Sequence, residues 1–229
     1  MSGAPTLWEI IIRILERGLY HTLLLTALGL SIGFILGLSL ALMRVYGAQE
    51  LIWFSSGYEK LFRGIPLIVL IYVFFYALPE IFWYIDPLEL RLGSVVIALA
   101  LRSAAYQSQI FRGAILSVDP GQMEAARALG MKGTQAFRHV IMPQALRLAV
   151  PGWSNEYAVV IKDTSFASAI GIMEMTYASY LLSIDYKELW ALNFLILAVI
   201  YFLFTYPISR IFGERQSKKL KKLGMGGEQ

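Results

Sequence analysis

Ionisable and amide side chains stand inside long apolar runs of this chain, and they are the first candidates for a functional site. Arg102, Tyr106 and Gln109 are spaced i, i+4 and i+7, so on a helix they share one face, which Ser103 widens to one side. Charged groups are costly in apolar surroundings, and a function is the usual reason for keeping them. These residues therefore form a candidate binding face for a polar solute.

A second set of polar residues follows about 50 positions later. Asn155 and Lys162 would share one helical stripe, and Glu156 and Asp163 form a second stripe one residue round. Together the two faces offer cations, anions and hydrogen-bond donors, which is what a solute carrying both charges requires. The alternative is structural: Arg102 and these charges neutralise one another between helices or across a dimer. The spacing leaves both interpretations open.

The composition indicates that these residues lie in a membrane protein. Of the 229 residues, 57% are hydrophobic and 16% are charged, against roughly 45–50% and about 25% in soluble domains. The mean hydropathy is +0.60. A net charge of +4 is too small to suggest nucleic-acid binding. With no cysteine and two histidines, we expect no disulfide, no metal site and no bound cofactor.

Five apolar runs are long enough to cross the roughly 30 Å hydrocarbon layer, which takes about 20 residues. The predicted spans are residues 19–43, 57–78, 92–111, 144–173 and 190–212. We expect residues 1–18 to form an amphipathic helix in the interface, residues 19–213 to form the transmembrane domain, and residues 214–229 to form a basic tail. The predicted fold is an all-α integral membrane protein with about five transmembrane helices.

Lysine and arginine distribution predicts the orientation of these spans. Basic residues concentrate in the connection 113–143 and in the tail, whereas acidic residues dominate the connections 79–91 and 174–189. By the positive-inside rule, the connection 113–143 and the C-terminus are cytoplasmic, and the N-terminus lies outside.

The connection 113–143 contains recognisable helix signals. Asp119 can cap a helix that begins at Pro120, with Gln122 completing a capping box. Gly130 stands where helices commonly end. A second cap is predicted at Thr134, and Pro143 opens the next span. Spacing alone describes a solvated helix–turn–helix that could dock into a groove on another protein.

The sequence of this connection resembles the EAA loop of ATP-binding cassette (ABC) importer permeases. That loop has the pattern EAA, three residues, G, nine residues and I-x-L-P. The matching residues here are Glu124, Ala125 and Ala126, then Gly130, then Val140, Ile141, Met142 and Pro143. Valine and methionine replace the isoleucine and leucine of the pattern, and both exchanges keep an apolar side chain.

Further segments, in the same order along residues 19–212, resemble the polar amino-acid uptake permeases. The family's RGTPL, AY-x-x-E-I-x-RG, NE and K-D/E-T/S elements correspond to Arg63-Gly64-Ile65-Pro66-Leu67, to Ala105-Tyr106 with Ile110-Phe111-Arg112-Gly113, to Asn155-Glu156, and to Lys162-Asp163-Thr164-Ser165. Ile65 stands in place of threonine, and Gln109 in place of glutamate.

This resemblance implies a multi-pass permease subunit in the cell membrane that belongs to an ATP-driven, binding-protein-dependent amino-acid importer. Such subunits pair with an identical or paralogous permease, bind two ATPase subunits that hold ATP and Mg²⁺, and receive substrate from an extracytoplasmic binding protein. The coupling residues would be Glu124, Ala125, Ala126, Gly130, Met142 and Pro143. The chain has no G-x-x-x-x-G-K-[ST] phosphate loop, so we expect neither ATP hydrolysis nor catalytic residues in it.

The resemblance also divides the polar residues by role. The NE and K-D-T elements occur across the family. We therefore expect a structural or gating role, rather than a role in substrate specificity, for Asn155, Glu156, Lys162 and Asp163. Arg102 stands where the family commonly has a small polar residue. We hypothesise that it holds a substrate carboxylate, with Tyr106 and Gln109 nearby, or else pairs with Glu156 or Asp163. Low negative charge on this span favours neutral polar or acidic substrates.

Two other classes of protein stay open from the sequence. A stand-alone channel or ion-coupled carrier would use the embedded charges as a conduction path. An intramembrane enzyme would need a motif that the chain lacks.

Overall fold

The computed structural model describes residues 5–214, and all regular structure in this range is helical, which confirms the predicted fold class. The α-helices are α1 (Leu7–Tyr46), α2 (Gln49–Gly64), α3 (Leu67–Ile81), α4 (Pro87–Leu116), α5 (Pro120–Ala128), α6 (Gly133–Ala136), α7 (Met142–Asp163), α8 (Met175–Asp185) and α9 (Trp190–Ile208). The 3-10 or π-helical segments are η1 (Phe137–Ile141), η2 (Thr164–Ile170), η3 (Lys187–Leu189) and η4 (Ser209–Glu214). The basic tail predicted at 214–229 lies outside the described residues, apart from its first position.

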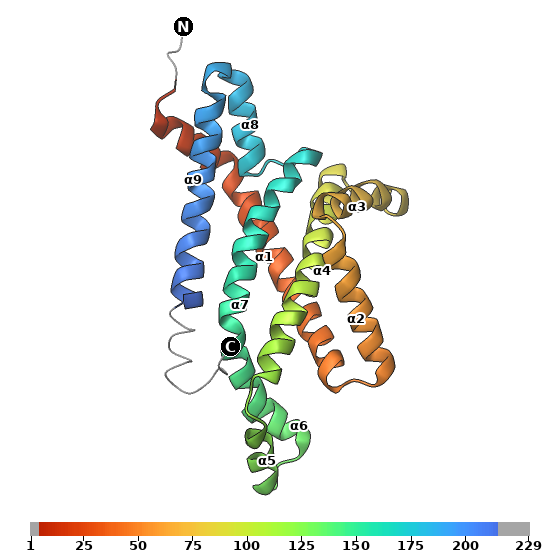
Figure 1. The fold of residues 1–229 in the computed structure, drawn as a ribbon. Helices are drawn as coiled ribbons and strands as arrows, with labels where there is room; N and C mark the ends of the chain where they lie inside the picture. Colours follow the sequence, from red (N-terminus) through yellow and green to blue (C-terminus); the bar gives the residue numbers. More distant parts are fainter. Residues whose placement is uncertain (1–4, 215–229) are drawn as a thin grey trace.

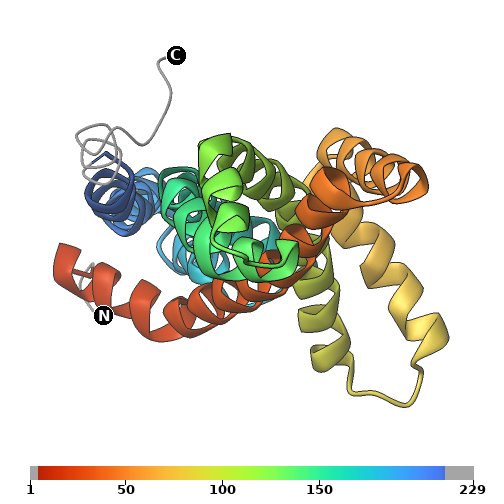
Figure 2. The same cartoon turned by 90° about the horizontal axis from the view of Figure 1, so that it is seen from below.

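The long helices α1, α4 and α7 form the centre of the bundle. Each contacts the other two, with α8 and α9 on one side and α2 and α3 on the other (Figure 1). Helices α5 and α6 form one end of the molecule, and the start of α1 lies near the opposite end. The view from below shows that α3 and the start of α4 project sideways from the bundle (Figure 2).

Helix α1 begins earlier than its predicted span. Thr6 and Glu9 form a reciprocal capping box, and the helix then continues for 40 residues, about 60 Å. The predicted boundary at residue 18 is therefore not a break in the helix. Ile10 and Ile14 are buried against α8 and α9, because this part of α1 crosses that hairpin. The interfacial position of residues 1–18 stays a prediction.

Close packing between α1 and α4 depends on small residues. A Cβ at Gly33 would lie 3.0 Å from the Ser103 Cβ, and one at Gly37 would lie 2.8 Å from the Gln107 Cβ. Glycine at these positions lets the two helices approach, which is how helices associate in lipid. A similar contact, absent from our sequence prediction, occurs at Gly18, where a Cβ would lie 2.4 Å from the backbone of Met175.

The second predicted span, 57–78, is two helices rather than one. Helices α2 and α3 meet at an angle of 100° across Ile65 and Pro66. Proline has no N–H to donate and disfavours the α conformation of the residue before it, and Ile65 accordingly has an extended backbone. The predicted span is therefore interrupted at Pro66, and whether the bent pair crosses the membrane as one span stays a prediction.

The number of spans stays a prediction. By length and composition, the candidates among the described residues are Leu7–Tyr46 and Lys187–Ile211, with the bent pair of α2 and α3 as a third. The predicted spans at 92–111 and 144–173 are helical over most of their length, in α4 and in α7 with η2. These two helices are the ones that carry the candidate site residues.

Candidate functional site

Arg102 lies where α2, α4 and α7 come together. Its guanidinium forms an ion pair with the carboxylate of Asp163, at the end of α7. The Tyr106 ring lies one turn along α4, with the Arg102 Cζ 5.1 Å from its centroid. The Cζ of Arg63, from the end of α2, is also 5.1 Å from this centroid. Both contacts are within the range of a cation–π interaction.

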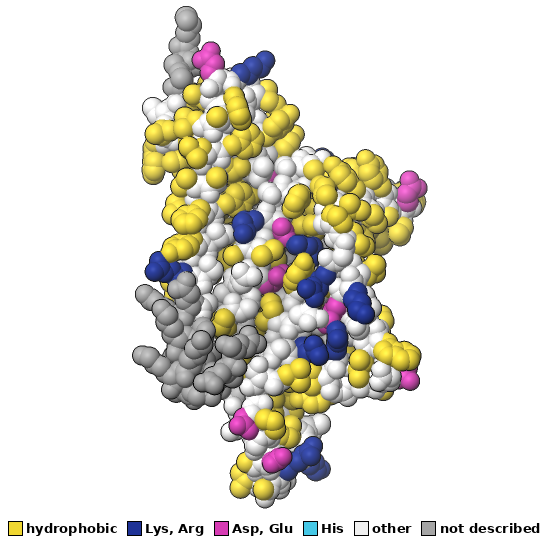
Figure 3. All heavy atoms as spheres, viewed as in Figure 1, with side chains coloured by type: hydrophobic (Ala, Val, Ile, Leu, Met, Phe, Trp, Pro, Cys, Tyr) yellow, Lys and Arg dark blue, Asp and Glu magenta, His cyan; other side chains and the backbone are white. Residues whose placement is uncertain are grey.

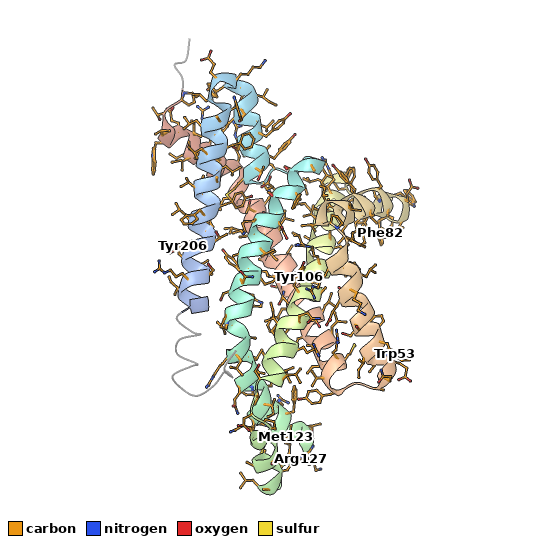
Figure 4. All side chains as sticks on the ribbon, viewed as in Figure 1. Trp53, Phe82, Tyr106, Met123, Arg127 and Tyr206 are labelled. Atoms are coloured by element: carbon orange, nitrogen blue, oxygen red, sulfur yellow. The ribbon has the colours of Figure 1, made fainter. Side chains whose placement is uncertain are left out.

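The surroundings of this group are charged on an otherwise apolar molecule. Figure 3 shows Lys, Arg, Asp and Glu side chains along the middle of one face, between apolar areas over α8 and α9 on one side and α3 on the other. Figure 4 shows Tyr106 at mid-height of the bundle, between α7 and α2. The charged groups thus lie between two apolar areas of this face.

A second, buried network joins α1, α4 and α7. Ser103 Oγ donates a hydrogen bond of 2.7 Å to Glu156 Oε1 and accepts one of 3.0 Å from Gln107 Nε2. The same amide nitrogen is 3.1 Å from the carbonyl oxygen of Leu30 on α1, and the Gln107 oxygen accepts from the indole of Trp153 at 3.0 Å. Each of these polar side chains makes a hydrogen bond with another group of the network, and these bonds stabilise the contact between the three helices.

Gln109 belongs to a third group, away from Tyr106. Its amide donates to Glu59 of α2, whose carboxylate also binds Arg44 of α1 and accepts from Ser108 Oγ at 2.6 Å. Glu59 is almost fully buried. Three side chains from two other helices therefore hold this carboxylate, and Arg44 neutralises its charge. A glutamate at position 109 would place a second negative charge against Glu59, which explains why glutamine fits this chain.

The predicted pathway residues are thus only partly brought together. The faces of α4 and α7 do meet, through the pairs of Arg102 with Asp163 and of Ser103 with Glu156. Asn155 and Lys162 are exposed. Glu59 was not among the predicted site residues. It is nevertheless an ionisable residue inside a predicted span, and such residues are costly and usually functional. Trp153 carried no signal that distinguished it from a packing residue.

The connection between α4 and α7 has the predicted helix signals at its start. Asp119 Oδ1 accepts a hydrogen bond of 2.7 Å from the N–H of Gly121 and so caps α5. Gln122 does not complete a capping box; its side-chain oxygen accepts from Gln144 Nε2 of α7 at 3.2 Å. The second cap was predicted two residues late, since Lys132 rather than Thr134 is the N-cap of α6.

Gly130 ends α5 in a Schellman motif. The N–H of Met131 bonds to the carbonyl of Ala126 at 3.1 Å, and the N–H of Gly130 bonds to that of Arg127 at 2.9 Å. Gly130 has φ +81°, in the left-handed region that glycine adopts without strain. The predicted role of this glycine as a helix end is confirmed.

The outward face of α5 differs from the one that the sequence suggested. Ala126 is 3% exposed and α5 packs against α6 and η1, so this alanine is buried within the chain itself; its predicted coupling role stays a prediction. Glu124 and Ala125 are exposed, and Leu129 is 83% exposed. Figure 4 shows Met123 and Arg127 on this helix at the end of the molecule. A docking partner would therefore meet Leu129 and Ala125.

Pro143 coincides with a change of helix type. Residues 137–141 form a π-helical turn, and the N–H of Met142 bonds to the carbonyl of Phe137. Proline cannot donate to the carbonyl four residues earlier and its ring crowds it, so the widened turn accommodates Pro143 without ending the helix. Met142 is half-buried and Pro143 is exposed.

Comparison with known proteins identifies the family. The family described as "binding-protein-dependent transport system inner membrane component" matches residues 29–222. The octopine transport system permease protein of Rhizobium meliloti is 39% identical over 214 residues, covering 90% of this chain and 85% of that protein. The L-cystine transport system permease protein TcyB of Bacillus subtilis is 39% identical over 177 residues, covering 76% and 74%.

Solved structures agree with this family. A crystal structure described as an amino acid ABC transporter with histidines is 33% identical, with a TM-score of 0.75, covering 90% of this chain and 94% of that chain. An inward-facing structure of the MetNI methionine ABC transporter has a TM-score of 0.71 at 22% identity and supports the fold. The predicted family resemblance and membrane location are confirmed: the chain belongs to the family of inner membrane components of binding-protein-dependent transport systems.

Proposed function

We propose that this chain is the permease subunit of an ATP-driven, binding-protein-dependent amino-acid importer. It forms the translocation pathway with a second permease subunit and is coupled to ATPase subunits that bind ATP and Mg²⁺. The named specificities of its relatives, octopine, L-cystine and glutamine, support an amino acid or an amino-acid derivative as the substrate. The similar amino acid ABC transporter structure supports the same class.

The observation that carries this proposal is the construction of α5. It stands at one end of the molecule with Leu129 exposed (Figure 1). Its Met123 side chain packs into a small core with Ile115 of α4, Ile141 of η1 and Ala145 of α7. A displacement of α5 would therefore move the ends of both long helices together.

The polar groups between α4 and α7 lie on the same two helices. The ion pair of Arg102 with Asp163 and the hydrogen bond of Ser103 to Glu156 join them at mid-height. A tilt of α7 against α4 changes both contacts, so motion at α5 reaches the charged cluster through two rigid helices. In this mechanism Arg102, Glu156 and Asp163 have structural and gating roles, and Ser103 holds Glu156 in place through its hydrogen bond.

Docking of the ATPase is tested by replacing Leu129. Leu129→Asp places a charge where an apolar contact is proposed, and we expect it to abolish both copurification of the ATPase and ATP-driven uptake, with the permease still in the membrane. Leu88→Asp is the matched control, because Leu88 is an exposed leucine at the start of α4, remote from α5. Uptake that survives Leu129→Asp with the ATPase bound would contradict this role for α5.

The alternative of a stand-alone channel or ion-coupled carrier predicts a different result. Such a protein would transport solute in vesicles without ATPase subunits or ATP. We expect no uptake by the chain alone, and uptake on addition of the ATPase, ATP and a loaded binding protein. Transport by the chain alone would replace the proposed function.

A further inference from the structure

A pocket of about 470 Å³ lies between α3, the start of α4 and η2. It belongs to the part of the molecule where α3 and the start of α4 project sideways from the bundle (Figure 2). Its wall is apolar and aromatic, with Phe75 of α3 and Leu90 of α4 among the lining residues. Of the described residues that line it, Arg91 alone is charged.

The guanidinium of Arg91 has no acidic partner among the residues that the structure describes. Its Nε donates to the carbonyl oxygen of Pro87, one turn earlier on the same helix, at 3.3 Å. The ion pairs in the described range involve Arg44 and Arg102 instead. A Cβ at Gly171, directly after η2, would lie 3.7 Å from Arg91 Nη1. The guanidinium therefore reaches from α4 to the end of η2, and its terminal N–H groups are available to a ligand.

One cation in an apolar pocket favours a ligand with one anionic group and an apolar body. Guanidinium groups bind phosphate and carboxylate oxygens through strong, charge-assisted hydrogen bonds. A zwitterionic amino acid would leave its ammonium group without an anionic partner among the lining residues, which is costly in an apolar pocket. A hydrocarbon chain has no such cost there.

The surface beside the pocket is apolar as well. Tyr76, Ile81 and Tyr84, close in sequence to lining residues, are exposed. Figure 3 shows the apolar area that covers α3. In a membrane component such a surface meets lipid, and exposed tyrosines are typical of the membrane–water interface. A phospholipid supplies both the anionic group and the apolar body that the pocket favours.

We propose that this pocket binds a membrane phospholipid, with the phosphate on Arg91 and an acyl chain against Phe75 and Leu90. The bound lipid joins α3, α4 and η2. Glu80 and Glu89 are exposed in the same stretch of sequence, so the attraction is that of one guanidinium for one phosphate rather than of a basic surface for an anionic membrane. This inference goes beyond the proposed function and does not depend on which solute is carried.

Lipid binding to the full chain, purified in detergent with the subunits that accompany it, tests the need for a phosphate. The probes are dioleoyl phosphatidylglycerol and dioleoylglycerol, which share their acyl chains and differ in the phosphate headgroup. Native mass spectrometry measures how much of each lipid stays bound. We expect about tenfold tighter binding of phosphatidylglycerol. Equal binding of the two lipids would overturn the proposal without need of any variant.

Variants at Arg91 locate the phosphate. Arg91→Gln should weaken phosphatidylglycerol binding by about tenfold and leave dioleoylglycerol binding unchanged, whereas Arg91→Lys should retain part of the preference. Because the side-chain hydrogen bond of Arg91 stays within α4, we expect Arg91→Gln to unfold in lipid-free detergent at the temperature of the unmodified protein.

Lys187→Gln is the matched control. Lys187 is an exposed cation in the connection between α8 and α9, on the other side of the bundle (Figure 1) and predicted on the same side of the membrane as Arg91. It should keep the full preference for phosphatidylglycerol. An unchanged preference in Arg91→Gln, or an equal loss in Lys187→Gln, would show that Arg91 is not the phosphate ligand.

A second permease chain and a binding protein are the competing occupants of the pocket. Replacement of Ile85, a lining residue, by the photoreactive p-benzoylphenylalanine distinguishes them in intact cells. We expect a phospholipid adduct that falls several-fold when Arg91→Gln is added. An adduct with a second permease chain or with the binding protein would overturn the proposal and make the pocket a protein interface. ATP-driven import is measured separately, so this inference and the proposed function can fail independently.

Discussion

Arg102 and Arg63 are close in space and differ in what surrounds them. Asp163 binds Arg102, so a solute carboxylate at Arg102 would have to compete with a carboxylate that is already in place. Arg63 has no such competitor among the described residues. The Tyr106 ring contacts both guanidinium groups, each with its Cζ 5.1 Å from the ring centroid.

At Gly130 the backbone conformation decides the effect of a substitution. Gly130→Val would force a β-branched residue to φ +81°, at a cost of about 1–2 kcal/mol, and open the Schellman motif. We expect faster tryptic cleavage after Arg127 and Lys132 in the detergent-solubilised protein. Gly133→Ala, at the start of α6, adds a Cβ whose nearest neighbour is Arg127 Nη2 at 4.0 Å, an ordinary contact, and should be cleaved like the unmodified protein. Equal cleavage of all three would contradict this account.

Residue-level signals in the sequence were most reliable where the physics is local. The cap at Asp119 and the helix end at Gly130 depend on a few neighbouring backbone groups, and both were predicted. The burial of Ala126 depends on α6 and η1 folding back over α5, which no local pattern encodes. The buried acid Glu59 required knowing that Arg44 and Gln109 face it from two other helices.

Among the helices, the contact of α1 with α4 is the one most sensitive to side-chain size. In Gly37→Val the added Cβ would lie 2.8 Å from the Gln107 Cβ and 2.9 Å from the carbonyl oxygen of Ala104, so the helices would have to separate. We expect a loss of about 1–3 kcal/mol in stability, measured as a lower unfolding temperature in detergent. Gly57→Val introduces the same residue into α2, where nothing lies within 4 Å, and should change that temperature little.

The length of an apolar run predicts the bounds of some helices and misses those of others. The fifth span was predicted at 190–212, and a candidate span lies at Lys187–Ile211. The run 57–78 was read as one span because its length is right, although Pro66 lies inside it. The length of the apolar run predicts one helix there, whereas Pro66 predicts a break. The break occurs, because proline disfavours the α conformation of the preceding residue, Ile65.

For the whole molecule, the natural absence of cysteine makes the orientation directly testable. Trp83→Cys, between α3 and α4, and Leu129→Cys, at the end of α5, each replace a side chain that is 83% exposed. The loop between α3 and α4 is predicted outside and α5 in the cytoplasm. We expect a membrane-impermeant maleimide to label Trp83→Cys in intact cells and Leu129→Cys only after permeabilisation. The reverse pattern would invert the predicted orientation.

The orientation of the molecule across the membrane stays a prediction. The start of α1 lies towards the end that carries the hairpin of α8 and α9, and the connection between α4 and α7 forms the opposite end (Figure 1). Sequence could not predict which polar faces meet, because Gln107 and Leu30 are 77 positions apart and no periodicity links them. Long-range pairing of this kind is set by the fit of side chains in three dimensions.

The 40-residue length of α1 has a consequence for how the protein is made. Gly33 and Gly37 complete their contacts with Ser103 and Gln107 only when this part of α4, 70 residues later, has left the ribosome. At typical synthesis rates of 5–20 residues per second that delay is about 4–14 seconds. During this interval the first helix stands in the bilayer with its packing face towards lipid. Membrane insertion of this chain thus includes a waiting step, and assembly begins when α4 arrives.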